Sequence, residues 1–219
     1  MIIKDKMTKN PVVIDVYATM SEAADIMTEK NFHRLPVMQN GKLVGLVTKG
    51  LLSSKGANGA TSLSIFELNY LLNKTPVKTV MIKAKDLITI HEDALLEEAA
   101  KLMLKYDIGC LPVLNDQEDL VGIMTQNDLF KAFLDVLGYN MPGSRVAVEV
   151  EDGMGVIGEI SKVFVDNHAN ISHVGVYRTE ENDKKCEVVL RTDITETQQL
   201  EKELNEHSFK VKSIVKNTK

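Results

Sequence analysis

The sequence predicts an α+β protein in which two copies of a βαββα unit precede a third unit of order βαββαβ. The first observation is a repeat, because residues 18–37 and 94–113 align without a gap at an offset of 76, with eight identical positions. The second is a change of pattern near Met141, where the repeat ends and a run of alternating apolar residues begins.

The two repeat copies contain the same elements in the same order. Apolar residues at i, i+3, i+4 and i+7 predict an amphipathic helix in each copy: Met20, Ala23, Ala24 and Met27, then Leu96, Ala99, Ala100 and Met103. A strand is predicted at 35–37 and at 111–114, a polar turn at 39–41 and at 115–117, and a second strand at 43–47 and at 120–124. A short helix at Leu51 or Leu129 closes each copy.

The segment between the copies has two parts. Residues 53–62, SSKGANGATS, have the composition of a flexible linker. Residues 64–74 are predicted to form a helix. We place the domains at 1–62, with the linker included, 63–140 and 143–219.

The third unit follows a different order. A strand is predicted at 145–150, a Gly-rich turn at 151–155, and a helix from Val156 to Asn167 by its apolar spacing. Strands at 171–177 and 186–191 flank a polar hairpin at 180–185, and a helix from about residue 195 to 206 precedes a last strand at 209–215. This order is the ferredoxin-like arrangement.

Composition excludes several classes of function. The net charge of −5 gives no basic field for nucleic acid. The amino terminus lacks a signal-length apolar run, and no segment approaches the roughly 18 apolar residues that span a bilayer, so we expect a soluble, cytoplasmic protein with no membrane partner. Cys110, Cys186 and the five histidines show no metal-ligand spacing.

No pattern of a catalytic site is present either. The sequence contains no nucleophile elbow, Walker loop or GxGxxG after a strand, and no carboxylate pair with a suitable His base. We therefore expect no enzymatic activity and no catalytic cofactor.

The stretch GIMTQNDLF, residues 122–130, carries the main candidate site. Thr125 at a helix start with Asp128 three residues later can serve as a plain helix cap. The duplicated pattern, however, resembles the CBS domain, and the tandem resembles a CBS pair over residues 1–138. That resemblance implies that Asp128 accepts hydrogen bonds from ribose hydroxyls and Thr125 contacts a phosphate of an adenosine ligand. It also implies that the backbone of Ile108, Gly109, Cys110 and Leu111 frames the adenine.

The first copy departs from this pattern. Thr48 is kept, but Leu51 stands where the second copy has Asp128, so we expect one competent site per chain. His33 and Arg34 occupy the positions of Gly109 and Cys110. The pseudo-twofold axis of such a pair could bring Arg34 toward phosphates held by Thr125. An arginine next to a strand can equally be solvated or ion-paired.

The third unit resembles an ACT domain. Its turn Asp152-Gly153-Met154-Gly155 opens a helix and is a candidate effector loop, since backbone N–H groups there can hold a carboxylate. The resemblance implies an amino acid ligand at an interface between paired copies, and hence a homodimer. The alternative is a tight turn in which the glycines provide backbone freedom.

These features together predict a regulatory protein that senses an adenosyl ligand (AMP, ADP, ATP, S-adenosylmethionine or NAD) and signals through its ACT domain. The order of a CBS pair and an ACT domain resembles bacterial acetoin-utilisation accessory proteins, which implies a role in acetoin or butanediol catabolism. The alternative is a scaffold that mediates assembly without binding a small molecule. The sequence names neither the adenosyl ligand nor the downstream partner.

Overall fold

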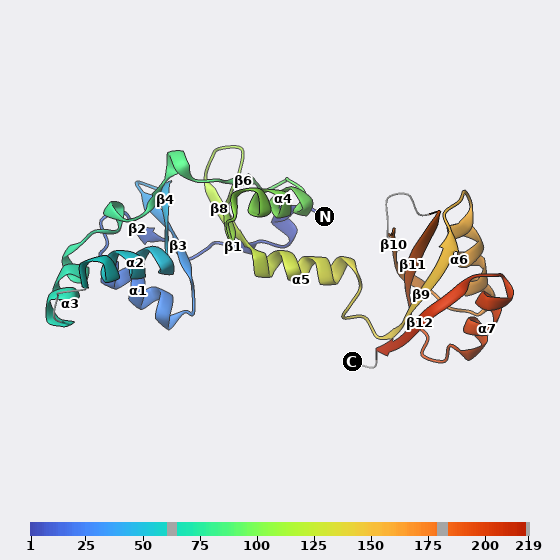
Figure 1. Cartoon of the computed structure of the whole chain (residues 1–219). Coiled ribbons are helices and arrows are strands. Elements are labelled where there is room, and N and C mark those ends of the chain that lie inside the picture. Colours follow the sequence, from blue (N-terminus) through green and yellow to red (C-terminus); the bar gives the residue numbers. More distant parts are fainter. Residues whose placement is uncertain (61–64, 179–183, 218–219) are drawn as a thin grey trace. The chain divides into compact units, whose positions relative to one another are not determined.

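The computed structural model describes residues 1–60, 65–178 and 184–217, which divide into two compact units, Met1–Phe130 and Lys131–Lys219 (Figure 1). The predicted α+β class, with two related copies and a third βαββαβ unit, is confirmed. Each unit is described by itself below.

The first unit holds both repeat copies. Its helices are α1 (Met20–Glu29), α2 (Lys49–Ala60), α3 (Ile65–Lys74) and α4 (Leu96–Tyr106). Its strands are β1 (Thr8–Lys9), β2 (Ile14–Asp15), β3 (Arg34–Gln39), β4 (Lys42–Thr48), β5 (Ile82–Lys83), β6 (Ile90–His91), β7 (Cys110–Leu114) and β8 (Leu120–Thr125). Helix α5 (Gln126–Val136) begins in this unit and ends in the second.

The amphipathic helices form as their spacing predicts. In α1, Met20, Ala23 and Met27 are buried, and in α4 the matching Leu96, Ala99 and Met103 are buried. Helix α1 starts with a capping box, in which the Glu22 N–H donates to Thr19 Oγ1 at 3.2 Å and the Thr19 N–H donates to Glu22 Oε2 at 2.7 Å.

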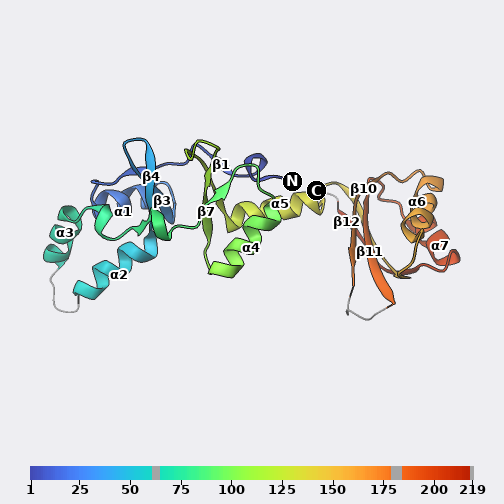
Figure 2. The same ribbon diagram turned by 90° about the horizontal axis from the view of Figure 1, so that it is seen from above.

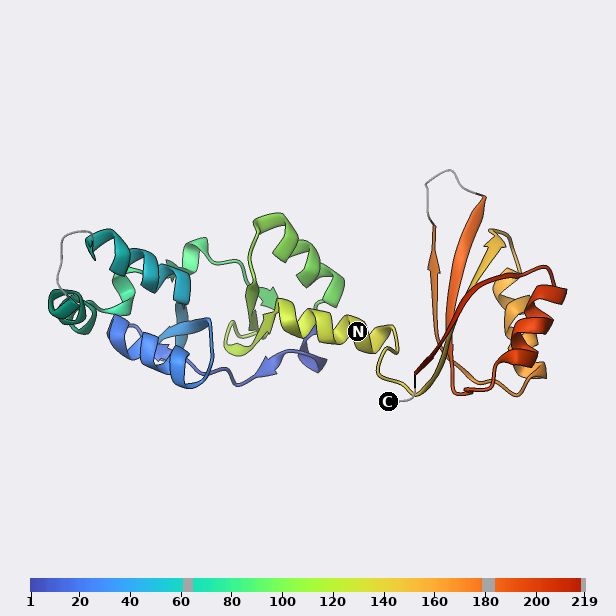
Figure 3. The same ribbon diagram turned by 60° about the horizontal axis from the view of Figure 1, so that its bottom comes forward.

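The two copies exchange their first strands (Figures 1 and 3). One sheet has the order β2-β3-β4-β5 and the other β1-β8-β7-β6. Strand β1 precedes the first copy but pairs with β8 of the second, and β5 precedes the second copy but pairs with β4 of the first. Neither copy therefore has a complete sheet without its neighbour.

A methionine next to each exchanged strand packs against a glycine of the receiving sheet. A Cβ at Gly122 would lie 2.3 Å from Met7 Sδ, and one at Gly45 would lie 2.7 Å from Met81 Sδ. A Cβ at Gly45 would also lie 2.5 Å from the backbone oxygen of Ile82 in β5. A side chain at residue 45 would require movement of the backbone of β5, whereas one at residue 122 would require movement of the Met7 side chain.

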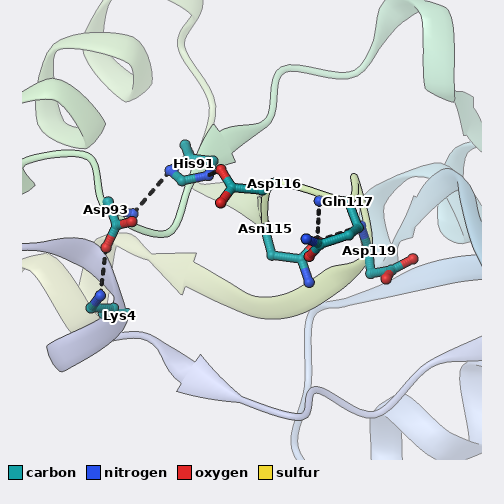
Figure 4. Close-up of polar contacts among 7 residues, drawn as sticks. All are labelled: Lys4, His91, Asp93, Asn115, Asp116, Gln117 and Asp119. Carbon is teal, nitrogen blue, oxygen red and sulfur yellow. Dashed lines mark hydrogen bonds and ion pairs between the residues drawn. The ribbon is translucent and has the colours of Figure 1, made fainter.

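Polar contacts hold the amino-terminal segment on the second copy (Figure 4). The Ile3 N–H donates to the Ala94 carbonyl at 2.9 Å, and Lys4 Nζ pairs with Asp93 Oδ1 at 2.6 Å. The Asp93 N–H in turn donates to His91 Nδ1, and His91 Nε2 lies 3.1 Å from Asp116 Oδ1. The Lys4 pair is exposed, so backbone bonding and the burial of Ile3 contribute more than its charge.

Polar and apolar contacts also join the two copies directly. Asn115 Oδ1 accepts from the N–H groups of Gln117 and Asp119 and shapes the β7–β8 turn (Figure 4). Lys42, in the first copy, reaches Asp119 at 2.7 Å. Leu46 of the first copy forms a buried cluster with Cys110 and Ile123 of the second.

The second unit is a four-stranded antiparallel sheet of order β10-β11-β9-β12 with two helices on one face (Figure 2). The elements are β9 (Gly143–Glu151), α6 (Val156–Asp166), β10 (Ile171–Tyr177), β11 (Lys185–Thr192), α7 (Gln198–Glu206) and β12 (Lys210–Asn217). Its core joins Val146, Val148 and Leu190 of the sheet to Phe164 of α6 and Leu204 of α7. The other face, described below as the open face, carries charged side chains, with Glu149 lying within 3.5 Å of Lys185, Lys210 and Lys212.

Several local predictions need correction. The predicted flexible linker at 53–62 is wrong over 53–60, which continue helix α2, while 61–62 lie outside the described residues. Helices α2 and α5 extend well past the short helices that were expected, and in α5 the buried Leu129 and Ala132 continue the apolar face. Helix α7 starts at Gln198 rather than near 195, and most of the predicted hairpin at 180–185 lies outside the described residues.

The close approach of β5 to Gly45 gives a testable prediction. Gly45→Ala should destabilise the first unit by about 1–3 kcal/mol, because the new methyl group overlaps a backbone oxygen that cannot rotate away. Urea unfolding followed by amide exchange in β4 would measure the loss.

A matched control is Gly50→Ala in exposed helix α2, where the nearest atom to a new Cβ is 3.9 Å away. It should gain about 0.5–1 kcal/mol from helix propensity. Equal effects at Gly45 and Gly50 would contradict the packing account.

Candidate functional site

Thr125 and Asp128 form a reciprocal set of hydrogen bonds at the start of α5. The Thr125 N–H and Oγ1 both donate to Asp128 Oδ2, at 2.9 and 2.7 Å, and the Asp128 N–H donates back to Thr125 Oγ1 at 3.2 Å. This is a capping box with Asp in place of the usual Glu or Gln. The capping interpretation of this motif therefore has direct geometric support.

The cap leaves part of the carboxylate available. All of its bonds use Oδ2, and among the described residues none donates a hydrogen bond to Asp128 Oδ1. A carboxylate has about four acceptor positions on its two oxygens. Asp128 is partly exposed, so it can hold the helix start with one oxygen and accept hydroxyl groups of a ligand with the other.

The first copy has half of this arrangement. The Leu51 N–H donates to Thr48 Oγ1 at 3.2 Å, which reproduces the bond from Asp128 to Thr125. Leu51 offers no acceptor for the Thr48 N–H or hydroxyl. The start of α2 is thus capped on one side and lacks an acceptor for a hydroxyl-bearing ligand.

Arg34 of the first copy reaches across to Gly109 of the second. Its Nη1 donates to the Gly109 carbonyl, which also accepts from the Gln126 N–H at 3.2 Å. A Cβ on residue 109 would lie 2.9 Å from Arg34 Nη2, so glycine leaves room for the guanidinium. Arg34 is half-buried, and no carboxylate of the described residues lies within 4 Å of it.

Cys110 and Leu111 bring the second-copy strand alongside Thr125. Cys110 pairs in register with Thr125, and Leu111 pairs with Met124. Burial raises the pKa of the Cys110 thiol, and the nearby Arg34 guanidinium opposes the shift. The structure thus brings together Arg34, Gly109, Cys110, Thr125 and Asp128.

The other two predicted residues of this site, Ile108 and His33, contribute only backbone hydrogen bonds to the described part of the chain. Ile108 is half-buried, and its N–H donates to the Met103 carbonyl at 3.0 Å. His33 is exposed and contributes its backbone carbonyl, which accepts from the Lys49 N–H at 2.8 Å. Gln126 was not predicted from the sequence; as the first residue of α5 its N–H has no partner within the helix, and it donates to the Gly109 carbonyl instead.

In the Gly-rich turn of the second unit, Asp152 is hydrogen-bonded, whereas the residues that follow it are exposed. Asp152 is engaged, because Arg178 Nε donates to its Oδ2 at 2.9 Å and its own N–H donates to the Lys184 carbonyl. Gly155, the N-cap of α6, has φ +93° and no side chain caps this helix. Gly153 and the side chain of Met154 are exposed. The first N–H groups of α6 are therefore not occupied by a side-chain cap.

No group of three or more His, Cys, Asp or Glu side chains among the described residues could hold a metal ion. No described helix is long and apolar enough to cross a membrane.

Comparison with protein families gives two matches. The CBS domain family matches residues 3–52 and 77–135, and the ACT domain family matches residues 144–209. Both are regulatory domain families. The two matched CBS segments coincide with the two copies, and the ACT segment lies in the second unit.

Curated relatives match the first unit. An L-aspartate semialdehyde sulfurtransferase of Methanocaldococcus jannaschii is 30% identical over 60% of this chain, which covers 23% of that protein. The CBS domain-containing protein YhcV of Bacillus subtilis is 31% identical over 58% of this chain and 81% of its own length. The chain spans between 23% and 56% of the length of the first curated relatives it matches.

Solved structures match the same region. The CBS domain pair of protein MJ0100, in complex with 5′-methylthioadenosine and S-adenosyl-L-methionine, is 30% identical with a TM-score of 0.51 over 61% of this chain and 95% of its own. CBSX2 from Arabidopsis thaliana, in complex with AMP, is 25% identical with a TM-score of 0.52 over 62% and 97%. A Vibrio cholerae protein provisionally assigned to acetoin utilization, AcuB, is 29% identical with a TM-score of 0.52 over 64% and 95%.

The capping geometry predicts a difference between the two copies. Thr125→Ala should destabilise the first unit by about 0.5–2 kcal/mol, because it removes both the cap acceptor and a donor to Asp128. Thr48→Ala, which removes one side-chain hydrogen bond, should cost less. Amide exchange in β8 and β4 measures the stability of the second and first copy, respectively. A larger loss of stability in Thr48→Ala than in Thr125→Ala would contradict the stronger cap at Thr125.

Proposed function

Since the chain belongs to the CBS-domain family and joins a CBS pair to an ACT domain, we propose that it is a regulatory protein that binds an adenosyl ligand at α5. The observation that carries the proposal is that the two carboxylate oxygens of Asp128 differ: Oδ2 caps α5, while Oδ1 is left available. Two neighbouring hydroxyl groups of a ribose are suitable donors for such an oxygen.

The surrounding groups fit the rest of an adenosine ligand. In this proposal the backbone of Ile108, Gly109, Cys110 and Leu111 frames the base, and the Thr125 hydroxyl at the positive end of the α5 dipole lies toward its phosphate end. Arg34 adds a cation with no carboxylate partner among the described residues, and the exposed His33 lies beside it in sequence. Support comes also from the CBS pairs that bind AMP or S-adenosyl-L-methionine.

The first copy does not form a second site in this proposal. Leu51 replaces the ribose-binding carboxylate, so one adenosyl ligand binds per chain. The alternative is a scaffold in which the CBS pair binds nothing. The half-cap at Thr48 favours a structural role for the first copy, whereas the available oxygen of Asp128 favours ligand binding in the second.

The ACT domain is proposed to add a second input and an assembly interface. An amino acid carboxylate would bind the uncapped start of α6 beside Asp152, Gly153, Met154 and Gly155, and paired ACT domains would make the protein a homodimer. A cytoplasmic role in acetoin or butanediol catabolism is proposed from the domain order and from the likeness to the AcuB protein. The downstream partner is a protein that reads the state of the ACT domain.

The binding proposal is tested by calorimetry and thermal shift with AMP, ADP, ATP, NAD and S-adenosylmethionine. A ligand at 100 times its Kd should stabilise the wild type by about 2.7 kcal/mol. Asp128→Ala should weaken binding about 10- to 100-fold, the loss expected for a hydrogen bond to a charged group. Asp116→Ala, which removes an exposed carboxylate of the same copy, is the control and should bind as the wild type does.

A gain-of-function variant sharpens this test. Leu51→Asp places a carboxylate three residues after Thr48 and completes the capping box of the first copy. If the carboxylate is the missing element, calorimetry should find a second, weaker site per chain. Binding that survives Asp128→Ala unchanged, or no binding by folded wild type, would favour the scaffold.

The assembly proposal has its own measurement. Light scattering at micromolar concentration should give twice the chain mass. A strict monomer would overturn the paired ACT domains and leave the CBS site unaffected.

A further inference from the structure

The chain that follows α5 is bound to the open face of the ACT sheet rather than hanging between the domains. Helix α5 ends at Val136 in a Schellman motif, in which the Tyr139 N–H donates to the Leu134 carbonyl at 2.9 Å and the Gly138 N–H to the Asp135 carbonyl at 3.0 Å. Gly138 takes the left-handed conformation that this ending requires, with φ +62°.

Three side chains of the sheet hold this ending. Arg191 of β11 donates from Nε to the Leu137 carbonyl at 2.7 Å, and its guanidinium lies 5.6 Å from the centre of the Tyr139 ring. Asn217 of β12 donates from Nδ2 to the carbonyls of Tyr139 and Met141, both at 2.9 Å. We call residues 137–141 with Arg191, His173 and Asn217 the clamp.

His173 of β10 completes the clamp by packing. A Cβ on Gly138 would lie 2.3 Å from His173 Nδ1, so the backbone of the helix ending lies directly against the imidazole. His173 of β10 pairs in register with Arg191 of β11, and Asn217 of β12 pairs with Gly143 of β9, so the three side chains come from three of the four strands. Gly138 is buried although it lies between two domains in sequence.

The helix dipole of α5 also favours the position of Arg191 at the end of this helix. Leu137 follows the last helical residue, and its carbonyl lies at the negative end of the α5 dipole, where a cation is favourable. Burial lowers the pKa of Arg191, with a further contribution from the charge of Arg145, which indicates that the guanidinium is partly removed from water.

We propose that the clamp makes the end of α5 part of the ACT domain and thereby links the adenosyl site to the ACT sheet through one helix. The first turn of α5 carries Gln126 and Asp128, and its last turn is held by Arg191. The link to ligand occupancy rests on the proposed function, whereas the clamp itself is a property of the free protein.

The clamp is tested first without ligand. Hydrogen exchange of the amides of residues 137–141 should be slow in the full-length wild type and about tenfold faster or more in the double variant Arg191→Ala/Asn217→Ala. Gly138→Ala, which leaves the sheet side chains intact, should have the same effect. The control Lys210→Ala removes a cation of the same open face that binds Glu149 instead, and it should leave these amides unchanged. Slow exchange in β9 of each variant checks that the domain is folded. Fast exchange of 137–141 in the wild type, or no change in the variants, overturns the clamp.

The link is tested second, with AMP as the probe. In the wild type, AMP should alter exchange in β10 and β11. The double variant should bind AMP within about twofold of the wild-type Kd, but AMP should no longer alter amide exchange in its β10 and β11. In Lys210→Ala, AMP should alter exchange in these strands as it does in the wild type. A full response in the double variant, or none in an AMP-binding wild type, overturns the link. If AMP does not bind, the proposed function and the link fail together, and the ligand-free result still decides the clamp.

Discussion

The exchange of first strands between the two copies is the constraint on which the first unit depends. Each four-stranded sheet borrows one strand of two residues, and such short strands have few ladder bonds of their own. Their position is set by the packing of Met7 over Gly122 and Met81 over Gly45, which a larger residue would disrupt. Because each copy completes the other, a group of the first copy can be held accurately against a site in the second. The contact between Arg34 and Gly109 is an example.

Exchange relates the copies by pseudo-symmetry, and the side chains then make them unequal. Arg34 and Cys110 hold equivalent places at the starts of β3 and β7. The Arg34 guanidinium is long enough to donate a hydrogen bond to the backbone of the other copy, whereas Cys110 makes only apolar contact with Leu46 of the first copy. The two copies also differ at the start of the helix that follows the next strand. Thr48 Oγ1 accepts one hydrogen bond from the Leu51 N–H, whereas Thr125 also donates to the side chain of Asp128. The second copy therefore gathers both the available carboxylate and the neighbouring positive charge.

The sequence predicted the helices and the repeat, which follow a periodic pattern, but not the short strands, which depend on contacts between residues far apart in the chain. Spacing located α1, α4 and α6, and the repeat indicated the two copies, because these features lie within one turn or one alignment. Strands β1 and β5 were not predicted, since two residues show no alternation, although Met7-Thr8-Lys9 and Met81-Ile82-Lys83 are themselves a repeat. Residues 53–60 were misjudged from their Gly and Ser content. For the site, spacing singled out Thr125 and Asp128, but the division of labour between the two carboxylate oxygens required coordinates.

In the proposed function, the Asp128 carboxylate would connect the stability of α5 with the binding of a ligand. A ligand can engage Asp128 in two ways, because Oδ2 holds the Thr125 N–H and hydroxyl while Oδ1 is left available. A ligand that draws the Thr125 hydroxyl to a phosphate would therefore change the cap of α5, and one that contacts Oδ1 alone would leave it in place. Adenosyl ligands with and without phosphate then differ in their effect as well as in their affinity. Only such a difference in interaction between two states of α5 can shift an equilibrium. A helix held at its far end by the ACT sheet is a suitable element to report that shift.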